Sequence, residues 1–135
     1  MILKTYSRVF TTDLDATLRT LRVVHDREPH LSFEYGDWKL VAIGDTLIVA
    51  GTNEALAPIR GSYGPWIVED IEQSRARLIE TGAEIIQEIA NVPTGKMMYA
   101  RHSDGIVVEY VQWAPELVER HILAPLRAGR LSSQI

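Results

Sequence analysis

The chain repeats one order of secondary-structure signals twice, and this repeat constrains its fold more than any other feature. A β-rich segment, "LKTYSRVF", precedes a stretch with apolar residues at helical spacing, "TTDLDATLRTLRVVH", and then three short strand-like segments that end near Gly51. The same order returns as "SYGPWIVE", "DIEQSRARLIETG" and three further strand-like segments. The sequence therefore predicts two βαβββ modules.

Local capping signals mark where the helices begin and end. The first helix is expected to have Thr12 as its cap, with Asp15 three residues later. The second has Asp70 as its cap, Gln73 three residues later and Gly82 as its stop. A last helix is expected to begin at Pro115, because proline suits the first turn of a helix.

These signals predict an α+β protein in which two βαβββ modules form curved mixed sheets around a cleft, followed by a C-terminal helix. We expect one domain over residues 1–135, with module one over about 3–52, module two over about 62–113 and the helix over about 115–126.

Composition narrows the class of partner. The 135 residues include no cysteine, so disulfides and thiolate metal sites are excluded. The net charge is −4 and the basic residues are scattered, which argues against a nucleic-acid partner. No apolar run approaches the ~20 residues of a membrane span, and no signal-peptide core is seen near the start. We therefore expect a cytoplasmic protein with no membrane partner.

The second module resembles a known family. The segments "VEDIEQSRARLIETGAEIIQE" and "PTGKMMYARHSDGIVVEYVQ" follow the order of capped helix, Gly-Ala turn, Pro-Thr-Gly, Asp-Gly hairpin and strand glutamate. This order resembles the vicinal oxygen chelate superfamily, which includes glyoxalase I, bleomycin-resistance proteins and extradiol dioxygenases. The resemblance spans roughly residues 3–113. A single module presents an open, curved sheet whose concave face and edges need cover, and relatives provide it by pairing modules within one chain or across two. We therefore expect a homodimer with clefts formed by both modules.

The resemblance indicates where a metal would sit in metal-dependent members. Carried over by position, their ligands fall on Tyr6, Ala50, Tyr63 and Glu109. Phenols with a pKa near 10 are poor ligands for divalent metals, and alanine offers no donor. We therefore expect neither a metal nor another cofactor.

Strand alternation predicts which side chains face the cleft. If Glu109 faces it, Val107 and Val111 do so too, while Val108 and Tyr110 face the helices. Tyr6, Arg8 and Phe10 share one cleft face, as do Tyr63, Pro65 and Ile67. The four histidines form no metal motif, and His102 is expected at the rim. The candidate ligand-binding residues are Tyr6, Arg8, Phe10, Ala50, Tyr63, Ile67, Tyr99, His102, Val107 and Glu109.

Glu109 lies in the middle of an apolar strand, where burial of a charge is costly unless the charge is paired or neutralised. Arg8 across the cleft could neutralise it, or the hydroxyls of Tyr6 and Tyr63 could hold it. It could instead anchor a ligand, or act as a general base with a pKa raised by burial.

The leading interpretation is a metal-independent small-molecule-binding protein of the bleomycin-resistance type, which sequesters an aromatic or cationic compound. The alternative is a glyoxalase-like metal-dependent lyase or dioxygenase. A third interpretation is a metal-free enzyme in which Glu109 acts as acid or base.

Overall fold

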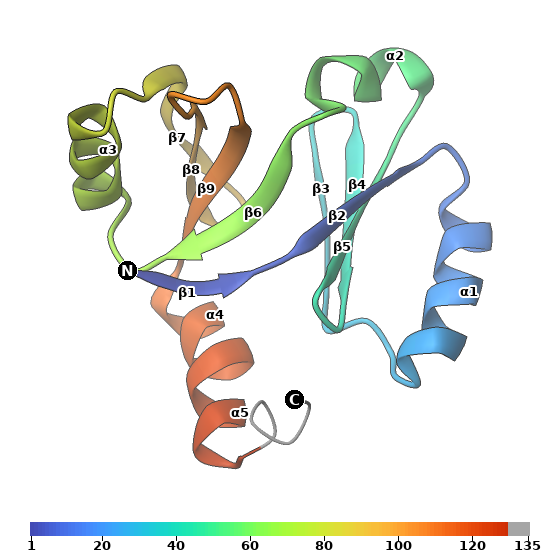
Figure 1. The fold of residues 1–135 in the computed structure, drawn as a ribbon. Coiled ribbons are helices and arrows are strands. Elements are labelled where there is room, and N and C mark those ends of the chain that lie inside the picture. The colour runs from blue at the N-terminus through green and yellow to red at the C-terminus, as the bar shows by residue number, and fades with distance from the viewer. Residues whose placement is uncertain (130–135) are drawn as a thin grey trace.

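The computed structural model describes residues 1–129, which form two β-sheets flanked by helices (Figure 1). The strands are β1 (Ile2–Thr5), β2 (Ser7–Thr11), β3 (Leu31–Tyr35), β4 (Trp38–Ile43), β5 (Thr46–Ala50), β6 (Tyr63–Val68), β7 (Glu84–Val92), β8 (Gly95–Arg101) and β9 (Val107–Trp113). The helical segments are α1 (Leu14–His25), α2 (Asn53–Leu56), η1 (Ala57–Ile59), α3 (Ile71–Glu80), α4 (Pro115–Val118), η2 (Glu119–Leu123) and α5 (Ala124–Arg127).

Each sheet mixes parallel and antiparallel neighbours. The four-stranded sheet has the order β2-β5-β4-β3, in which only β2 and β5 run parallel. The five-stranded sheet has the order β1-β6-β9-β8-β7, in which only β6 and β9 run parallel. Two βαβββ units and a C-terminal helix are present, so the predicted fold class is confirmed.

The start of the chain departs from the prediction of one strand over residues 3–10. It divides at Tyr6 into β1, which belongs to the five-stranded sheet, and β2, which belongs to the four-stranded sheet. The Tyr6 N–H donates to the carbonyl of Pro65 at 3.1 Å, and the Ser7 N–H donates to that of Asp45 at 2.8 Å. Pro65 lies in β6 of the five-stranded sheet and Asp45 in the turn between β4 and β5 of the other, so this segment ties the two sheets together.

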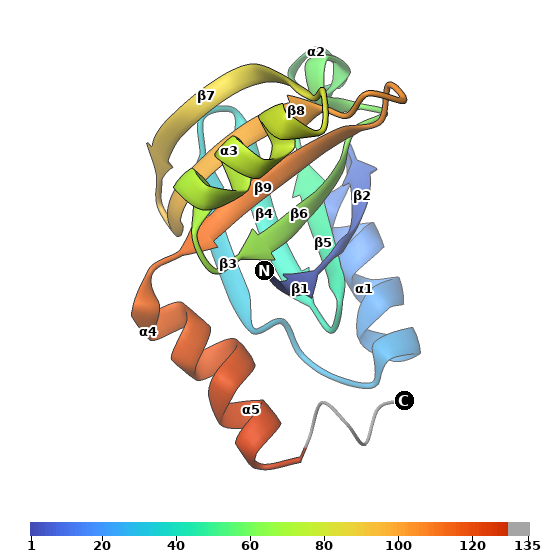
Figure 2. The same cartoon turned by 60° about the vertical axis from the view of Figure 1, so that its left-hand side comes forward.

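Three apolar clusters define the layers of the molecule. One cluster fills the space between the sheets and includes Leu47, Ile67 and Trp113. The other two lie beneath the helices, around Ile43 under α1 and around Val108 under α3. Figure 2 shows α3 against the outer side of β8 and β9, with the four-stranded sheet behind them. The inner faces of the two sheets thus cover one another within a single chain.

The helix ends follow the capping rules, with one shift. The Asp13 side chain accepts from the Ala16 N–H at 3.1 Å, so Asp13 and not Thr12 caps α1. The Asp70 side chain accepts from the Gln73 N–H at 3.1 Å, as predicted for α3. Gly82 follows α3 with a φ of +90°, a left-handed conformation that glycine adopts without steric cost.

The final helix is confirmed and contains a π-helical turn. Segments α4, η2 and α5 follow one another without a break, and Ile122 of η2 is buried in the cluster between the sheets. None of the helices described over residues 1–129 combines the length and the apolar character needed to cross a membrane.

Candidate functional site

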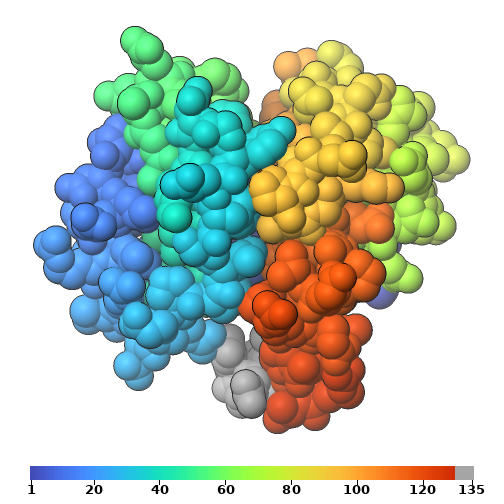
Figure 3. Space-filling view, turned by 180° about the vertical axis from the view of Figure 1, so that it is seen from behind, coloured from blue at the N-terminus to red at the C-terminus, as the bar shows by residue number. Residues whose placement is uncertain are grey.

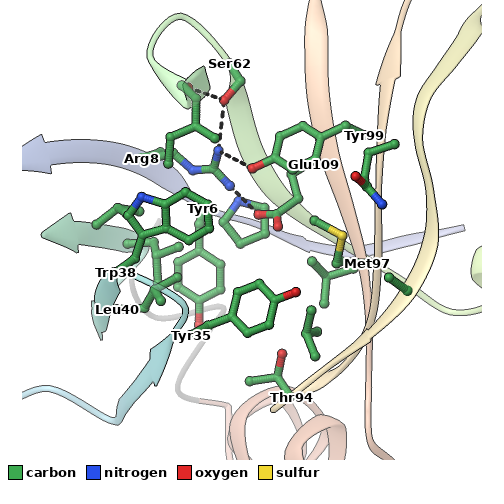
Figure 4. Close-up of a pocket in the computed structure, with 18 of the residues that line it drawn as sticks. Tyr6, Arg8, Tyr35, Trp38, Leu40, Ser62, Thr94, Met97, Tyr99 and Glu109 are labelled. Carbon is green, nitrogen blue, oxygen red and sulfur yellow. Dashed lines mark hydrogen bonds and ion pairs between the residues drawn. The ribbon is translucent and has the colours of Figure 1, made fainter. Parts of the chain in front are cut away.

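A cavity of about 390 Å³ lies between the two sheets, and both sheets contribute to its walls (Figure 4). This volume lies within the range of small-molecule sites. Figure 3 shows the residues of β3 and β4, in cyan, next to those of β7, in gold, along one seam of the surface. Two cavity-lining side chains on these edge strands, Tyr35 and Ile86, are 38% and 39% exposed. They therefore mark the mouth of the cavity.

Most of the wall is apolar or aromatic. Side chains from the four-stranded sheet and from β8 and β9 form it, among them Phe33, Tyr35, Trp38, Leu40, Met97, Val107, Val111 and Trp113. The Trp38 indole N–H donates to the carbonyl of Ala55 at 2.8 Å, which fixes the ring. The Tyr35 ring lies 6.3 Å from it, within the range of aromatic pairs. This wall can pack against a flat apolar ligand.

The polar end of the cavity is built around an ion pair between Arg8 and Glu109. Their side chains are only 3% and 15% exposed. Arg8 Nη1 also donates to Ser62 Oγ at 2.9 Å and to the Tyr99 hydroxyl at 3.3 Å. Tyr99 lies directly opposite Glu109 on the neighbouring strand, so both side chains point to the same face. The guanidinium is thus held in place by three side chains.

Burial controls the acid–base properties of this end. It raises the pKa of the Glu109 carboxyl above its ordinary value, and the Arg8 guanidinium opposes that rise. Burial also raises the pKa of the Tyr99 phenol, and the Glu109 charge adds to the effect. Glu109 Oε1 contacts Arg8, whereas Oε2 has no hydrogen-bond partner among the described residues. Glu109 lines the cavity and its side chain keeps 15% of its surface exposed. Because Oε2 is neither hydrogen-bonded nor fully buried, it is accessible from the cavity.

A second polar group, made of Tyr6, His30 and His121, lies where the cavity wall meets the C-terminal helix. The Tyr6 hydroxyl and His30 Nε2 are 2.8 Å apart, and the His30 ring lies 5.1 Å from that of His121 on the C-terminal helix. Burial and the neighbouring His121 lower the pKa of His30 to about 4. Burial also raises the pKa of the Tyr6 phenol and lowers that of His121. These groups are therefore uncharged at neutral pH and connect the last helix to the cavity.

The structure brings half of the candidate residues together around the cavity: Tyr6, Arg8, Tyr99, Val107 and Glu109. The alternation predicted for β9 is confirmed, because Val107, Glu109 and Val111 line the cavity. Val108 and Tyr110 lie in the cluster beneath α3. The proposal that Arg8 neutralises Glu109 is also the arrangement found.

Two candidates on β6 lie elsewhere. Tyr63 is 58% exposed and does not line the cavity, while Ile67 is fully buried in the core between the sheets. The pairing of β6 with β9 is irregular between Tyr63 and Trp66, so simple alternation fails at this point. The Tyr63 hydroxyl therefore does not hold Glu109.

The other three candidates also lie outside the cavity. Phe10 packs against the core, with the Arg8 guanidinium 5.9 Å from its ring centre. Ala50 is buried at the end of β5 and borders a separate shallow hollow. His102 Nε2 lies 2.7 Å from the Tyr110 hydroxyl, on the α3 side of the sheet. His102 is thus on the opposite face of the sheet from the cavity.

Several cavity residues were not singled out from the sequence. Tyr35, Trp38, Ser62 and Met97 line the cavity but are not among the candidates that the sequence predicts. The alternation of Leu31, Phe33 and Tyr35 in β3 was the available signal, because it places three large apolar groups on one face.

The four positions at which the resemblance implies metal ligands do not fit a metal here. Ala50 has no donor, Tyr63 is exposed outside the cavity, and the Tyr6 hydroxyl is engaged with His30. Glu109 is paired with Arg8, whose positive charge disfavours a second cation nearby. Within residues 1–129, no group of three or more His, Cys, Asp or Glu side chains is placed to hold a metal ion. The absence of a metal stays a prediction.

Comparisons with solved structures agree with this architecture. An uncharacterised protein from Methanosarcina mazei is 35% identical, with a TM-score of 0.80, over 84% of this chain and 94% of its own. Methylmalonyl-CoA epimerase from Mycobacterium tuberculosis is 17% identical, with a TM-score of 0.65, over 87% of this chain and 93% of its own.

A Streptomyces coelicolor methylmalonyl-CoA epimerase variant in complex with 2-nitronate-propionyl-CoA is 16% identical, with a TM-score of 0.65, over 85% of this chain and 97% of its own. No protein-family model and no curated protein matches the chain. At 16–17% identity, the epimerases show a shared fold alone. The chain belongs to the same family as the Methanosarcina mazei protein.

Proposed function

We propose that this chain binds a small aromatic compound, without a metal, in the cavity between its two sheets. The observation that carries the proposal is the cavity itself, which has a largely apolar, aromatic wall and one buried ion pair at its end. Apolar walls with a few placed polar groups are the usual makeup of small-molecule sites. Sequestration of the bleomycin-resistance type requires such a binding cavity and no catalytic group.

A metal-dependent lyase or dioxygenase has less support. The side chains at the metal-holding positions of such relatives do not converge in this chain, and the one carboxylate among them is paired with Arg8. The epimerase neighbours share the fold at 16–17% identity, which does not transfer an activity.

Two observations favour a second candidate, a metal-free enzyme with Glu109 as general base. Its Oε2 is accessible from the cavity and burial raises its pKa, as proton transfer at neutral pH requires. Incubating the protein with a bound compound in deuterated water tests this. Deuterium uptake by the compound that the Glu109→Gln variant abolishes would support catalysis, and an unchanged mass would exclude it.

Native mass spectrometry of the freshly purified protein tests the binding proposal directly, because it reports any co-purified compound and the subunit count together. A screen of aromatic compounds by thermal shift extends the test. Trp38 and Trp113 line the cavity whereas Trp66 does not, so quenching of tryptophan fluorescence gives a local signal.

Two tyrosine variants form a matched pair for the same test. Tyr35→Ala removes an aromatic ring at the mouth, whereas Tyr63→Ala removes one that is exposed elsewhere. An aromatic contact contributes about 0.5–1.5 kcal/mol beyond its buried area, so Tyr35→Ala should weaken binding roughly 2- to 12-fold. Tyr63→Ala should leave affinity unchanged. Equal losses in both variants, or no ligand in the whole screen, would refute the proposal.

A further inference from the structure

The polar end of the cavity presents one unoccupied acceptor to a ligand. Glu109 Oε1 is taken by Arg8, and Oε2 has no partner within the described part of the chain, although it is accessible from the cavity. Figure 4 shows the carboxylate at the Arg8 end of the pocket, with Met97 and Tyr35 on the walls beyond it. A carboxylate oxygen only accepts hydrogen bonds when ionised, so a ligand group that faces it must donate.

We infer that this end selects an aromatic ligand with a neutral hydrogen-bond donor, such as a phenolic hydroxyl or an amide N–H, over the charged analogues of the same ring. This inference rests on the proposed function and specifies the chemical class of its ligand. It also narrows the sequence-based expectation of an aromatic or cationic compound to the neutral, donor-bearing class.

The charge of the site carries the inference. Arg8 and Glu109 together are neutral, and the ion pair is almost fully excluded from solvent. A cationic ligand would lose its hydration and meet the Arg8 charge beside the carboxylate, with no net negative charge to compensate it. An anionic ligand would meet the free oxygen of Glu109. A neutral donor avoids both penalties and gains a charge-assisted hydrogen bond.

The guanidinium cannot readily turn away to release the carboxylate to a cation. Ser62 and Tyr99 accept from its Nη1 atom, at 2.9 and 3.3 Å. The rings of Phe10 and Tyr99 lie 5.9 and 6.0 Å from its central carbon, within the range of cation–π contacts. The ion pair is therefore expected to persist when a ligand binds, and Oε2 remains the group that the ligand meets.

Four probes with one ring system test the inference: 2-naphthol, 2-methoxynaphthalene, 2-naphthylmethylammonium and 2-naphthoate. Affinities are measured by tryptophan quenching and by calorimetry at pH 7 and at two salt concentrations. We expect 2-naphthol to bind most tightly and the methyl ether, which lacks the donor, about tenfold or more weakly. Both ions should bind more weakly than 2-naphthol.

Glu109→Gln should reverse the preference, because it leaves the Arg8 charge without its partner. The variant should bind 2-naphthoate more tightly than 2-naphthol, while the exposed control Glu84→Gln keeps the original order. A thermal melt and circular dichroism establish that the variant is folded. If it is not folded, the four affinities of the unaltered chain decide the matter alone.

The outcomes separate this inference from the proposed function. Tightest binding of the ammonium probe or of 2-naphthoate to the unaltered chain, or equal binding of the phenol and its ether, would overturn the inference and leave a small-molecule site standing. No binding of any probe, together with no compound in native mass spectrometry and no hit in the aromatic screen, would overturn the proposed function itself.

Discussion

Breaking the Arg8–Glu109 ion pair from either side should destabilise the fold, but by unequal amounts. The pair is nearly excluded from solvent, so a single substitution leaves one charge buried without its partner. Loss of one member of a buried pair costs about 3–5 kcal/mol. Glu109→Leu should reach this range, because the guanidinium left behind cannot release its proton and keeps only Ser62 and Tyr99 as partners.

Arg8→Met should cost less at low pH, because the carboxyl left behind can take up a proton. Burial already holds the pKa of Glu109 above its ordinary value of 4.5, and removal of Arg8 removes the group that opposes this rise. A carboxyl whose pKa is higher in the folded state than in the unfolded state adds to the free energy of unfolding. This contribution is fully present at any pH below the unfolded-state pKa. That contribution is lost as the pH rises through the folded-state pKa, by about 1.36 kcal/mol per pKa unit.

Urea denaturation between pH 4.5 and 8.5, followed by circular dichroism, measures these effects. The unfolding free energy of Arg8→Met should fall more steeply with rising pH than that of the unaltered chain. In Glu109→Leu the carboxyl is absent, so its contribution to this pH dependence should disappear. The double variant should recover most of the loss, since apolar replacement of both partners is often neutral or stabilising. Arg101→Met, which breaks an exposed pair with Glu84, should cost under about 1 kcal/mol. Costs for both cavity variants as small as that of this control would refute the argument.

Three further predictions concern metal, assembly and pH. Protein purified without chelator should contain less than stoichiometric Zn, Ni, Mn or Fe, and elemental analysis that finds one tightly held ion per subunit would contradict this. We expect a homodimer, as the resemblance implies, and sedimentation would contradict it by showing a monomer at every concentration. Unfolding free energy should fall as the pH drops from 6.5 towards about 4, because the folded chain keeps His30 neutral with its pKa lowered to about 4. His30→Gln should reduce this slope in urea titrations, and an unchanged slope would count against the His30 argument.

Local signals in the sequence were sufficient for most of the fold. Strands β3, β4 and β5 lie in the three short strand-like segments that the sequence predicts before Gly51. Helix α3 lies between its Asp70 cap and Gly82, because capping depends on neighbours within one turn. The division of the first strand at Tyr6 could not be predicted from local sequence signals. It arises from hydrogen bonds to Pro65 in β6 and to Asp45 in the β4–β5 turn, which are far away in the sequence and belong to different modules.

The candidate site was predictable only where strands alternate regularly. Period-two alternation correctly placed Arg8 and Glu109 on the cleft faces of β2 and β9, since Val9 packs under α1 and Val108 under α3. That the two side chains pair was one of several alternatives, and the structure shows it to be the arrangement present. Tyr63 was misplaced because β6 pairs irregularly with β9 at that position. The aromatic mouth could not be assigned, because it is closed by edge strands of two separate sheets, and no local pattern specifies which strands meet.

The duplicated sequence builds an unsymmetrical site because only one module is preceded by an additional strand. Tyr6 and Tyr63 occupy matched positions, yet Tyr6 is 4% exposed and Tyr63 is 58% exposed. The chain before Tyr6 forms β1, which joins the opposite sheet, so Tyr6 lies where the chain crosses between the sheets. The polar end then combines Arg8 of module one with Glu109 of module two. Neither module alone contains both charges, and a site that is neutral overall therefore depends on module one packing against module two.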